Sequence, residues 1–252
     1  MLPFRSQIEQ TVEWLRKKVT DARAEGLVLG VSGGIDSAVC AFLIKEAFPE
    51  NSLGLILPCK SCGGDVTDAE AVVSACSLNS ETIDLSDMHE MLMKEAQSSA
   101  IFRKKQPVTE RIKMTDANLR ARLRMCTLYS FANALNYLVV GTDNAAELYT
   151  GYFTKFGDGA VDILPIANLT KRMVRVWAKE LGVPKQILEK APSAGLWEGQ
   201  TDEEELGVGY DAIDDYLEGK EIPEKDKKRI EGLHRTTHHK RETPPKPPPF
   251  DE

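Results

Sequence analysis

The sequence has few cysteines and no apolar run long enough to cross a membrane. Five cysteines occur in 252 residues, an odd number in a chain without a signal-peptide pattern, so no disulfide framework is indicated. We therefore expect a reducing, cytoplasmic environment and no membrane partner. Cys59 and Cys62 form a Cys-x-x-Cys pair, but no second pair follows at finger spacing, so structural zinc lacks two ligands. We favour two ordinary loop thiols, and redox or metal control at this pair stays open.

Basic residues are fewer than acidic residues. The chain has 32 lysines and arginines against 39 acidic residues, a net charge of −7, so a nucleic-acid surface would have to be a local patch against an unfavourable mean field. We expect no nucleic-acid partner. A hydrophobic content of 42% suits a sizeable core. We expect one domain over residues 1–243 and a stiff proline-rich tail over 244–252.

Two common nucleotide-binding signatures are missing. No lysine follows Gly33 and Gly34, so the chain lacks a Walker A loop, and Gly-x-Gly-x-x-Gly is absent too. What is present is a short apolar strand over 27–31, a glycine turn, and a helix that opens at Asp36. The glycines allow the backbone to approach a ligand, and the helix N–H groups and dipole point at it. The pattern predicts a phosphate site.

Asp36 lies beside the expected phosphates and would repel them unless a cation lies between, so we expect Mg²⁺ there. Thr142 ends another predicted strand, over 139–142, and Glu147 follows it, so both should lie at the same edge of the sheet. Asp36 and Glu147 could therefore share the metal. The alternative for each is a solvated acidic residue at a helix start.

Strands and helices alternate along the chain. This order predicts a doubly wound parallel sheet with helices on both faces, which binds its ligand beyond the carboxyl ends of the strands. Residues 98–114 are basic and unpatterned, and we expect a mobile loop. A long helix over 115–138 has a wide apolar face that would pack on its own sheet or on a second subunit. The other expected helices cover 1–23, with a capping box of Ser6 and Glu9, 36–48, 65–77, 88–96, 169–182, 210–217 and 223–233, and the other expected strands cover 53–57 and 81–85.

Three later segments suggest ligand contacts. Residues 149–162 combine aromatics, glycines and charges, as in a loop that holds a ring, sugar, phosphate or carboxylate. Lys171 and Arg172 start a helix where cations oppose the dipole, which indicates an anionic partner. Residues 191–209 have the composition of a lid or an inter-subunit loop. The basic cluster over 234–241 indicates anion binding more than metal binding.

A series of motifs, in order, resembles the ammonia-dependent NAD synthetase family of the ATP pyrophosphatase superfamily. The motifs are Ser-Gly-Gly-Ile-Asp-Ser from Ser32, Asn118-x-x-x-Arg122-x-Arg124, Gly-Thr-Asp-Asn-Ala-Ala-Glu from Gly141, Thr-Lys-Phe-Gly-Asp-Gly from Thr154, Leu-Thr-Lys-Arg from Leu169, Asp-Glu-x-Glu-Leu-Gly from Asp202, and His239-Lys240-Arg241.

The resemblance implies an adenine nucleotide alpha hydrolase-like, Rossmann-like fold. It also implies amidation of deamido-NAD by ammonia, at the expense of ATP and through an acyl-adenylate, to give NAD, AMP and pyrophosphate, the last step of NAD biosynthesis. The implied catalytic residues are Asp36, Glu147 and Lys171, with Asp36 and Glu147 on Mg²⁺. The implied ATP site comprises Gly30, Val31, Ser32, Gly33, Gly34, Ile35, Asp36, Ser37, Thr142, Lys171 and Ser193. The implied deamido-NAD site comprises Asn118, Arg122, Lys155, Asp158, Asp162, Glu205, His239 and Lys240, partly across the interface of a homodimer.

The chain departs from the family pattern at three places, one of which is the Cys59 and Cys62 pair that the pattern does not contain. Ser193 replaces an expected threonine and keeps the hydroxyl, whereas Gly195 replaces an expected acidic residue. Two rival hypotheses are a GMP or tRNA-modifying synthetase, for which no appendage is evident, and a non-catalytic ATP sensor, which would not need Asp36, Glu147 and Lys171. No amidase-sized domain is evident, so free ammonia is the expected nitrogen donor, and a separate glutaminase subunit stays open.

Overall fold

A computed structural model describes residues 3–60, 63–190 and 201–248 of the chain. Four parallel strands form one sheet in the order β3-β2-β1-β4. The strands are β1 (Gly26–Gly30), β2 (Ser52–Ile56), β3 (Asn79–Thr82) and β4 (Tyr137–Val140). The chain builds outward from β1 through β2 to β3 and then returns to the other side of β1 for β4. The predicted doubly wound parallel sheet is therefore confirmed, and its switch point lies between β1 and β4.

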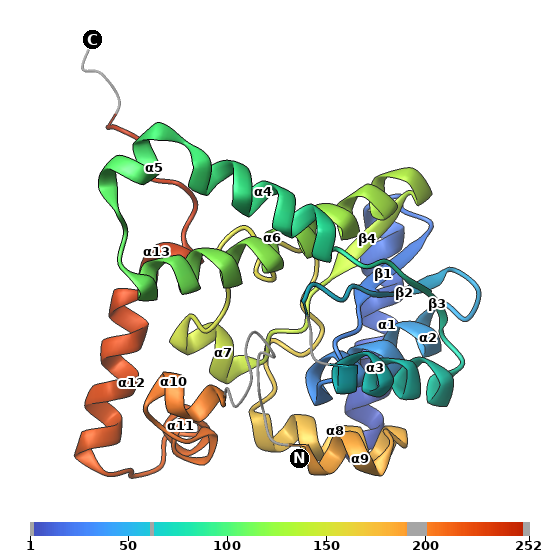
Figure 1. Ribbon diagram of the computed structural model, residues 1–252. Helices are drawn as coiled ribbons and strands as arrows, with labels where there is room; N and C mark the ends of the chain where they lie inside the picture. Colours follow the sequence, from blue (N-terminus) through green and yellow to red (C-terminus); the bar gives the residue numbers. More distant parts are fainter. Residues whose placement is uncertain (1–2, 61–62, 191–200, 249–252) are drawn as a thin grey trace.

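The helices surround this sheet (Figure 1). Those that precede β4 are α1 (Phe4–Asp21), α2 (Ile35–Ala47), α3 (Gly63–Cys76), α4 (Ser86–Ser98), α5 (Ala100–Lys105) and α6 (Thr109–Leu135). Those that follow it are α7 (Ala145–Thr150), α8 (Lys171–Leu181), α9 (Lys185–Glu189), α10 (Asp202–Leu206), α11 (Tyr210–Leu217), α12 (Glu224–Thr236) and α13 (His238–Arg241).

The alternation of side chains along β1 produces two cores. Leu27 and Leu29 belong to a cluster with buried residues of α1, α2, α3 and α8, whereas Val28 belongs to a second cluster with Val139 and the apolar face of α6. Successive strand residues point to opposite faces, so helices cover both sides of the sheet. A third cluster around Tyr210 holds α7, α11 and α12 together. Figure 1 shows α11 and α12 on the side of α7 that faces away from the sheet.

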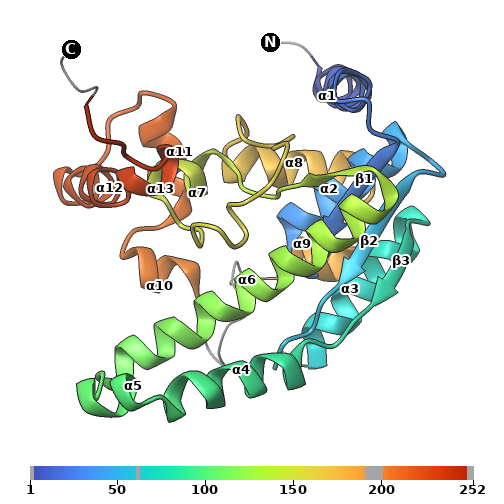
Figure 2. The same ribbon diagram turned by 90° about the horizontal axis from the view of Figure 1, so that it is seen from above.

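The structure corrects four local predictions. Residues 98–114 are not a loop, because α5 and the start of α6 lie there; with α4 they form an arm that extends beyond the sheet (Figure 2). The long helix ends at Leu135, since Asn136 takes a left-handed conformation with φ 56°, and residues 137–138 belong to β4. The third strand covers Asn79–Thr82 and not 81–85. Pro3 occupies the N-cap of α1, so the proposed Ser6–Glu9 capping box is wrong. Within the described ranges, we find no helix with the length and apolarity that a membrane span requires.

Candidate active site

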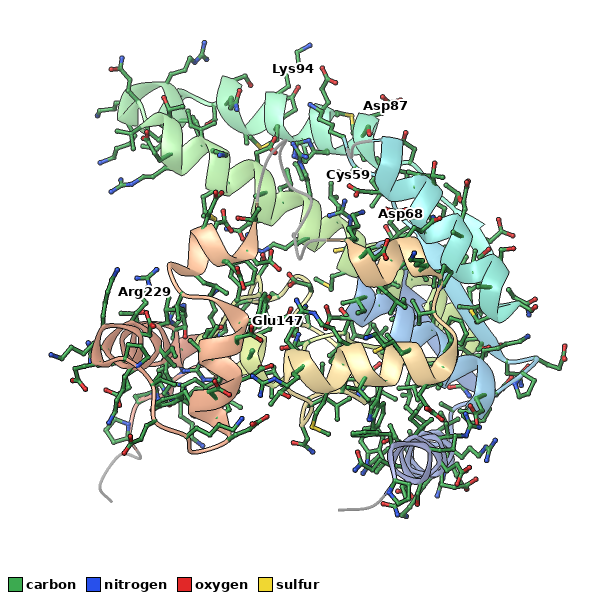
Figure 3. The ribbon with its side chains drawn as sticks, turned by 90° about the horizontal axis from the view of Figure 1, so that it is seen from below. Cys59, Asp68, Asp87, Lys94, Glu147 and Arg229 are labelled. Atoms are coloured by element: carbon green, nitrogen blue, oxygen red, sulfur yellow. The ribbon has the colours of Figure 1, made fainter. Side chains whose placement is uncertain are left out.

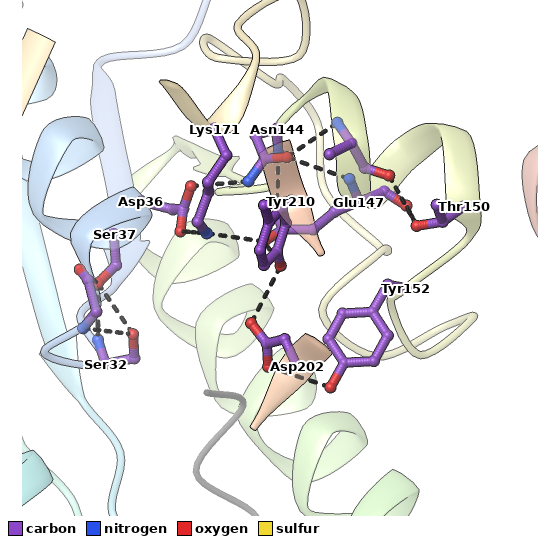
Figure 4. Close-up of polar contacts among 12 residues, drawn as sticks. Ser32, Asp36, Ser37, Asn144, Glu147, Thr150, Tyr152, Lys171, Asp202 and Tyr210 are labelled. Atoms are coloured by element: carbon purple, nitrogen blue, oxygen red, sulfur yellow. Dashed lines mark hydrogen bonds and ion pairs between the residues drawn. The ribbon is translucent and has the colours of Figure 1, made fainter. Parts of the chain in front are cut away.

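The glycine turn between β1 and α2 is built as a cradle. Gly34 is the N-cap of α2, and Gly33 adopts φ +80°, a conformation that favours glycine. The hydroxyl of Ser37 donates to the Gly34 carbonyl at 3.0 Å and accepts from the Ser32 amide at 3.2 Å. Its oxygen also lies 3.0 Å from the Ser32 hydroxyl (Figure 4). These bonds fix the turn, so the N-terminus of α2 is presented as an anion site.

A lysine from a distant helix joins two carboxylates beside this turn. The Lys171 Nζ lies 2.5 Å from Asp36 Oδ2 and 3.2 Å from Glu147 Oε1, and the Lys171 side chain is only 2% exposed. Asp36 comes from the first turn of α2, Glu147 from α7 and Lys171 from the first turn of α8. The structure thus brings together the three residues predicted to be catalytic.

Asn144 explains why α7 meets α2 here. Its side-chain oxygen accepts from the amides of Ala146 and Glu147, and Glu147 Oε2 accepts from the Asn144 amide, so the two residues form a capping box. The Asn144 Nδ2 donates to Asp36 Oδ1 at 2.9 Å. One buried amide therefore starts α7 and fixes the carboxylate of α2.

Asp214 of α11 plays the corresponding part for α8. It is fully buried, and its carboxylate accepts from the backbone amides of Lys171 at 3.0 Å and Arg172 at 2.7 Å. The side chain of Arg172 contacts Asp215 and Glu218 of the same region. The anionic partners of this helix start are thus, in the free chain, protein carboxylates.

A chain of hydroxyls and carboxylates extends from Glu147 toward the surface. The Tyr210 hydroxyl lies 3.2 Å from Glu147 Oε1 and 3.1 Å from Asp202 Oδ2, and its ring lies under Lys171, with 4.7 Å from Nζ to the centroid. The Tyr152 hydroxyl continues the chain and lies 3.1 Å from Asp202 Oδ1 (Figure 4). It also lies 2.6 Å from Glu205 Oε2. Sequence reasoning selected Glu205 from this group and missed Tyr210, Asp202 and Tyr152. The Asp-Glu-x-Glu-Leu-Gly motif that begins at Asp202 was the available signal.

Burial and charge compete at this site. Burial raises the pKa of Glu147 to about 7, although Lys171 opposes the shift. Burial disfavours the charge of Lys171, yet Asp36 and Glu147 outweigh it and raise its pKa above the ordinary value. Burial and the neighbouring carboxylates raise the pKa of Tyr210 as well. The two carboxylates therefore favour the charged form of Lys171.

The donor set suits a hard divalent cation. Among the described residues, no group of three acidic, histidine or cysteine side chains is arranged to hold a metal ion. Mg²⁺ is commonly held by one or two carboxylates together with substrate phosphates, and Asp36 and Glu147 are two such carboxylates beside a phosphate cradle. These residues fit Mg²⁺ when the phosphates complete its coordination.

A cavity of about 460 Å³ extends from the glycine turn to α6. All the predicted ATP residues that the structure describes line it except Gly33; they are Gly30, Val31, Ser32, Gly34, Ile35, Asp36, Ser37, Thr142 and Lys171. Ser193, Gly195 and the first part of the predicted lid lie outside the described residues, while residues 202–206 of that segment form α10.

The predicted dinucleotide residues divide into two groups. Asn118, Asp158, Glu205 and Lys240 line the cavity. Arg122, Lys155, Asp162 and His239 are absent from the described lining. They have structural contacts: Arg122 donates to the Lys155 carbonyl, Lys155 donates to the His239 carbonyl, and Asp162 accepts from the Val139 amide at 2.7 Å.

A second set of contacts joins α13 to the segment after α7. Lys240 donates to the carbonyls of Gly151 at 2.8 Å and Phe153 at 2.6 Å. Arg241 donates to the Tyr149 carbonyl at 3.2 Å, in the last turn of α7. The basic C-terminal cluster therefore binds backbone carbonyls in the free chain and fixes one wall of the cavity.

The fold and the cradle define a Rossmann-like α/β protein with a phosphate-binding turn of the Ser-Gly-Gly-x-Asp-Ser type. The NAD synthase family model matches residues 7–244. The chain belongs to the NAD synthase family, whose members use ATP as a substrate and are ligases. The family and the fold predicted from the motifs are thus confirmed.

Individual relatives agree with this assignment. The NH(3)-dependent NAD(+) synthetase of Alkaliphilus oremlandii is 59% identical over 248 residues, which is 97% of each chain, and that of Alkaliphilus metalliredigens is 56% identical over 241 residues, 96% of this chain and 97% of the relative. Among solved structures, NMN synthetase from Francisella tularensis superposes with a TM-score of 0.91 at 42% identity, over 98% of this chain and 99% of that chain. The NH3-dependent NAD synthetase from Campylobacter jejuni gives a TM-score of 0.77 at 25% identity, over 98% of this chain and 100% of that chain.

Proposed function

We propose that the protein amidates the nicotinate carboxylate of deamido-NAD with free ammonia. The carboxylate oxygen attacks the α-phosphate of ATP and pyrophosphate leaves; ammonia then attacks the acyl-adenylate carbonyl and displaces AMP, so NAD forms. The observation that carries this proposal is the position of Lys171 between Asp36 and Glu147 at the mouth of the phosphate cradle.

The roles follow from where charge develops. The N–H groups at the start of α2 bind phosphate, and Lys171 stabilises charge on the α-phosphate and the leaving group. Asp36 and Glu147 would hold Mg²⁺, which supplies further neutralisation of the phosphates when bound. No covalent nucleophile is needed. Exclusion of water protects the acyl-adenylate from hydrolysis.

The dinucleotide would lie along the α6 side of the cavity. Asn118, Asp158, Glu205 and Lys240 line this region and are proposed contacts. Arg122, Lys155, Asp162 and His239 do not line the described cavity, and we propose that such residues contact the dinucleotide partly across the interface of a homodimer.

We also propose a cytoplasmic homodimer. The arm of α4, α5 and α6 exposes large apolar side chains, among them Met88, Met91, Leu92 and Met114, and burial of such a patch favours association. Light scattering should give the mass of a dimer. A monomer at micromolar concentration would contradict the proposal of a site shared between subunits.

A second candidate is the formation of NMN. It is favoured by the close superposition on a structure described as NMN synthetase. Both reactions amidate a nicotinate carboxylate, and the substrates differ in the adenylyl half alone. The values of kcat/KM for nicotinate mononucleotide and deamido-NAD, measured in parallel, decide between them.

The test is to incubate the protein with deamido-NAD, ATP and Mg²⁺, with ammonium or glutamine in parallel, and to follow NAD, AMP and pyrophosphate. Equal amounts of NAD and AMP with ammonium, and none with glutamine, are expected. AMP without NAD would indicate another acceptor, and no consumption of ATP would favour a sensor. Asp36→Asn should lower turnover by about 10²-fold or more through loss of a metal ligand, while the exposed Asp21→Asn serves as the control.

A further inference from the structure

The cradle is short of one expected cation. In phosphate loops of the Walker type a lysine directly follows the glycines, but here Ile35 and Asp36 follow Gly34. A lysine from a distant part of the sequence occupies the neighbourhood of the loop. Lys190, the residue after α9, lines the same cavity as Ser32 and Gly34.

Two carboxylates hold the Lys190 ammonium in place. Its Nζ lies 3.0 Å from Asp65 Oδ1 and 2.7 Å from Asp68 Oδ2, and the Gln186 side chain donates to Asp68 Oδ1 at 3.2 Å. Both acids belong to α3, and Figure 3 shows Asp68 where α3 approaches α9. Burial opposes the charge, but the hydrogen bonds to Asp68 and Asp65 raise the pKa of Lys190. The side chain is thus both charged and anchored.

The anchor itself lies against the glycine turn. A Cβ added to Gly33 would come within 2.7 Å of the Asp68 Cβ and 2.8 Å of the Asp65 carbonyl oxygen. The first turns of α3 therefore pack directly against the glycine turn. The Lys190 ammonium, which is held by these two acids, therefore lines the same cavity as Ser32 and Gly34.

The hydrogen bonds of the ammonium leave room for a ligand. An ammonium has three N–H donors, and the contacts found among the described residues occupy two of them. The side chain is 33% exposed and lines the cavity, so the remaining donor is available to a ligand there. A cation fixed in advance stabilises an anion more than a mobile surface lysine does, because little reorganisation is required on binding.

We propose that Lys190 supplies the phosphate-binding cation that the glycine loop lacks, and that it contacts the β- and γ-phosphates of ATP and the pyrophosphate that leaves. This role is distinct from that of Lys171, which is joined to the two proposed metal ligands. The inference rests on the proposed function for the identity of the leaving group, but it requires only that the site bind a polyphosphate.

The test compares Lys190→Gln and Lys190→Arg with Lys185→Gln. Lys185 is a matched control because it lies on α9, is 83% exposed, and is paired with Glu189 away from the cavity. We expect Lys190→Gln to raise the KM for ATP and the inhibition constant of pyrophosphate about tenfold, the effect typical of one charge-assisted hydrogen bond. The KM for the nicotinate substrate should stay within about twofold of wild type. Lys190→Arg should retain most of the affinity, and Lys185→Gln should match wild type.

A purely structural tether between α3 and α9 would give a different result. Loss of that tether would lower the melting temperature and raise all the KM values together, and this outcome would overturn the proposal, as would an unchanged pyrophosphate constant. Calorimetric binding of Mg²⁺-pyrophosphate needs no turnover. If that binding depends on Lys190 while no NAD is formed, the proposed function fails and the assignment of Lys190 stands.

Discussion

The amide of Lys171 donates to a carboxylate oxygen of Asp214, 43 residues later in the chain, at 3.0 Å. The contact joins α8 to α11, and the second oxygen of the same carboxylate accepts from the next amide, that of Arg172. The first turn of a helix has free N–H groups that require acceptors, and here the acceptor comes from another helix. The position of the Lys171 side chain between Asp36 and Glu147 therefore depends on a residue that does not touch the cavity.

Asp214→Ala should consequently lower both stability and turnover. It leaves two amides without their acceptor in a buried position, which costs about 1–3 kcal/mol for each unsatisfied group, and it releases the start of α8. Urea unfolding and steady-state kcat measure the two effects. Asp211→Ala is the matched control, because Asp211 lies on the same helix and is 81% exposed. Equal stability of the two variants would contradict the role given to Asp214.

Two glycines with nearly equal positive φ angles allow the effect of backbone strain to be separated from the effect of close packing. Gly33 has φ +80° and no room for a Cβ beside Asp68, whereas Gly182 has φ +82° and no atom within 4 Å of the added Cβ. Gly182→Ala should cost about 1–2 kcal/mol from left-handed backbone strain alone. Gly33→Ala should cost more and should also displace α3 from the cradle.

The measurements for this pair are urea unfolding and calorimetric affinity for ATP. Gly182→Ala is expected to bind ATP like wild type, since it lies at the end of α8. Gly33→Ala is expected to lose ATP affinity by more than tenfold. If Gly33→Ala bound ATP normally, the close packing of α3 on the turn would not contribute to ATP affinity.

Tyr210 has one hydroxyl proton and two carboxylate neighbours, Glu147 and Asp202. Tyr210→Phe keeps the ring under Lys171 but removes the hydrogen bond, so the buried carboxylates lose a donor and Glu147 loses a contact that fixes its position. We expect a loss of about 1–3 kcal/mol in stability and a fall in kcat of about tenfold. Tyr152→Phe is the control, because the hydroxyl that it removes is hydrogen-bonded to Asp202 and Glu205 and not to the carboxylate of Glu147. A larger kcat effect for Tyr152→Phe would reverse this ranking.

The sheet could be predicted because its signal is local. Leu27 and Leu29 lie in a short apolar run that ends at glycines, and helices with a regular apolar period separate the strands, so topology follows from general rules. Within the arm, α4 was expected over 88–96, but the helical structure of residues 98–114 could not be predicted in this way. None of the described residues of α5 is buried, and Ile101 is 61% exposed, so the sequence of α5 has no apolar period that would reveal a helix.

The candidate site could be predicted where a distinctive motif lies at the carboxyl end of a predicted strand. Asp36 and Glu147 follow the carboxyl ends of β1 and β4, which are neighbours in the sheet, and both lie in distinctive motifs. Asp214 and Lys190 could not be found in the same way. Each is an ordinary charged residue in a charged stretch. Its partner is determined by how the helices pack, which the spacing of apolar residues does not reveal.

His89 of α4 gives a prediction for pH dependence. It is completely buried, its Nε2 lies 3.2 Å from Asp116 Oδ1, and its Nδ1 has no hydrogen-bond partner among the described residues. Burial lowers the pKa of His89 from its ordinary value of 6.5, an effect that Asp116 opposes and that Arg120 and Lys60 reinforce.

The sign of the effect on stability follows from proton counts. Below about pH 6.5 the unfolded chain binds a proton at His89 that the folded chain resists, so the unfolded state holds more protons and the free energy of unfolding decreases as the pH falls. The contribution of His89 to stability is fully present above pH 6.5. It is lost as the pH falls through the pKa of His89 in the folded chain. Urea unfolding at pH 7, 6 and 5 should therefore show a smaller loss for His89→Gln than for wild type. His238→Gln, in which the replaced side chain is 67% exposed, should lose as much as wild type. Parallel losses for all three proteins would mean that His89 titrates alike in the folded and unfolded chains.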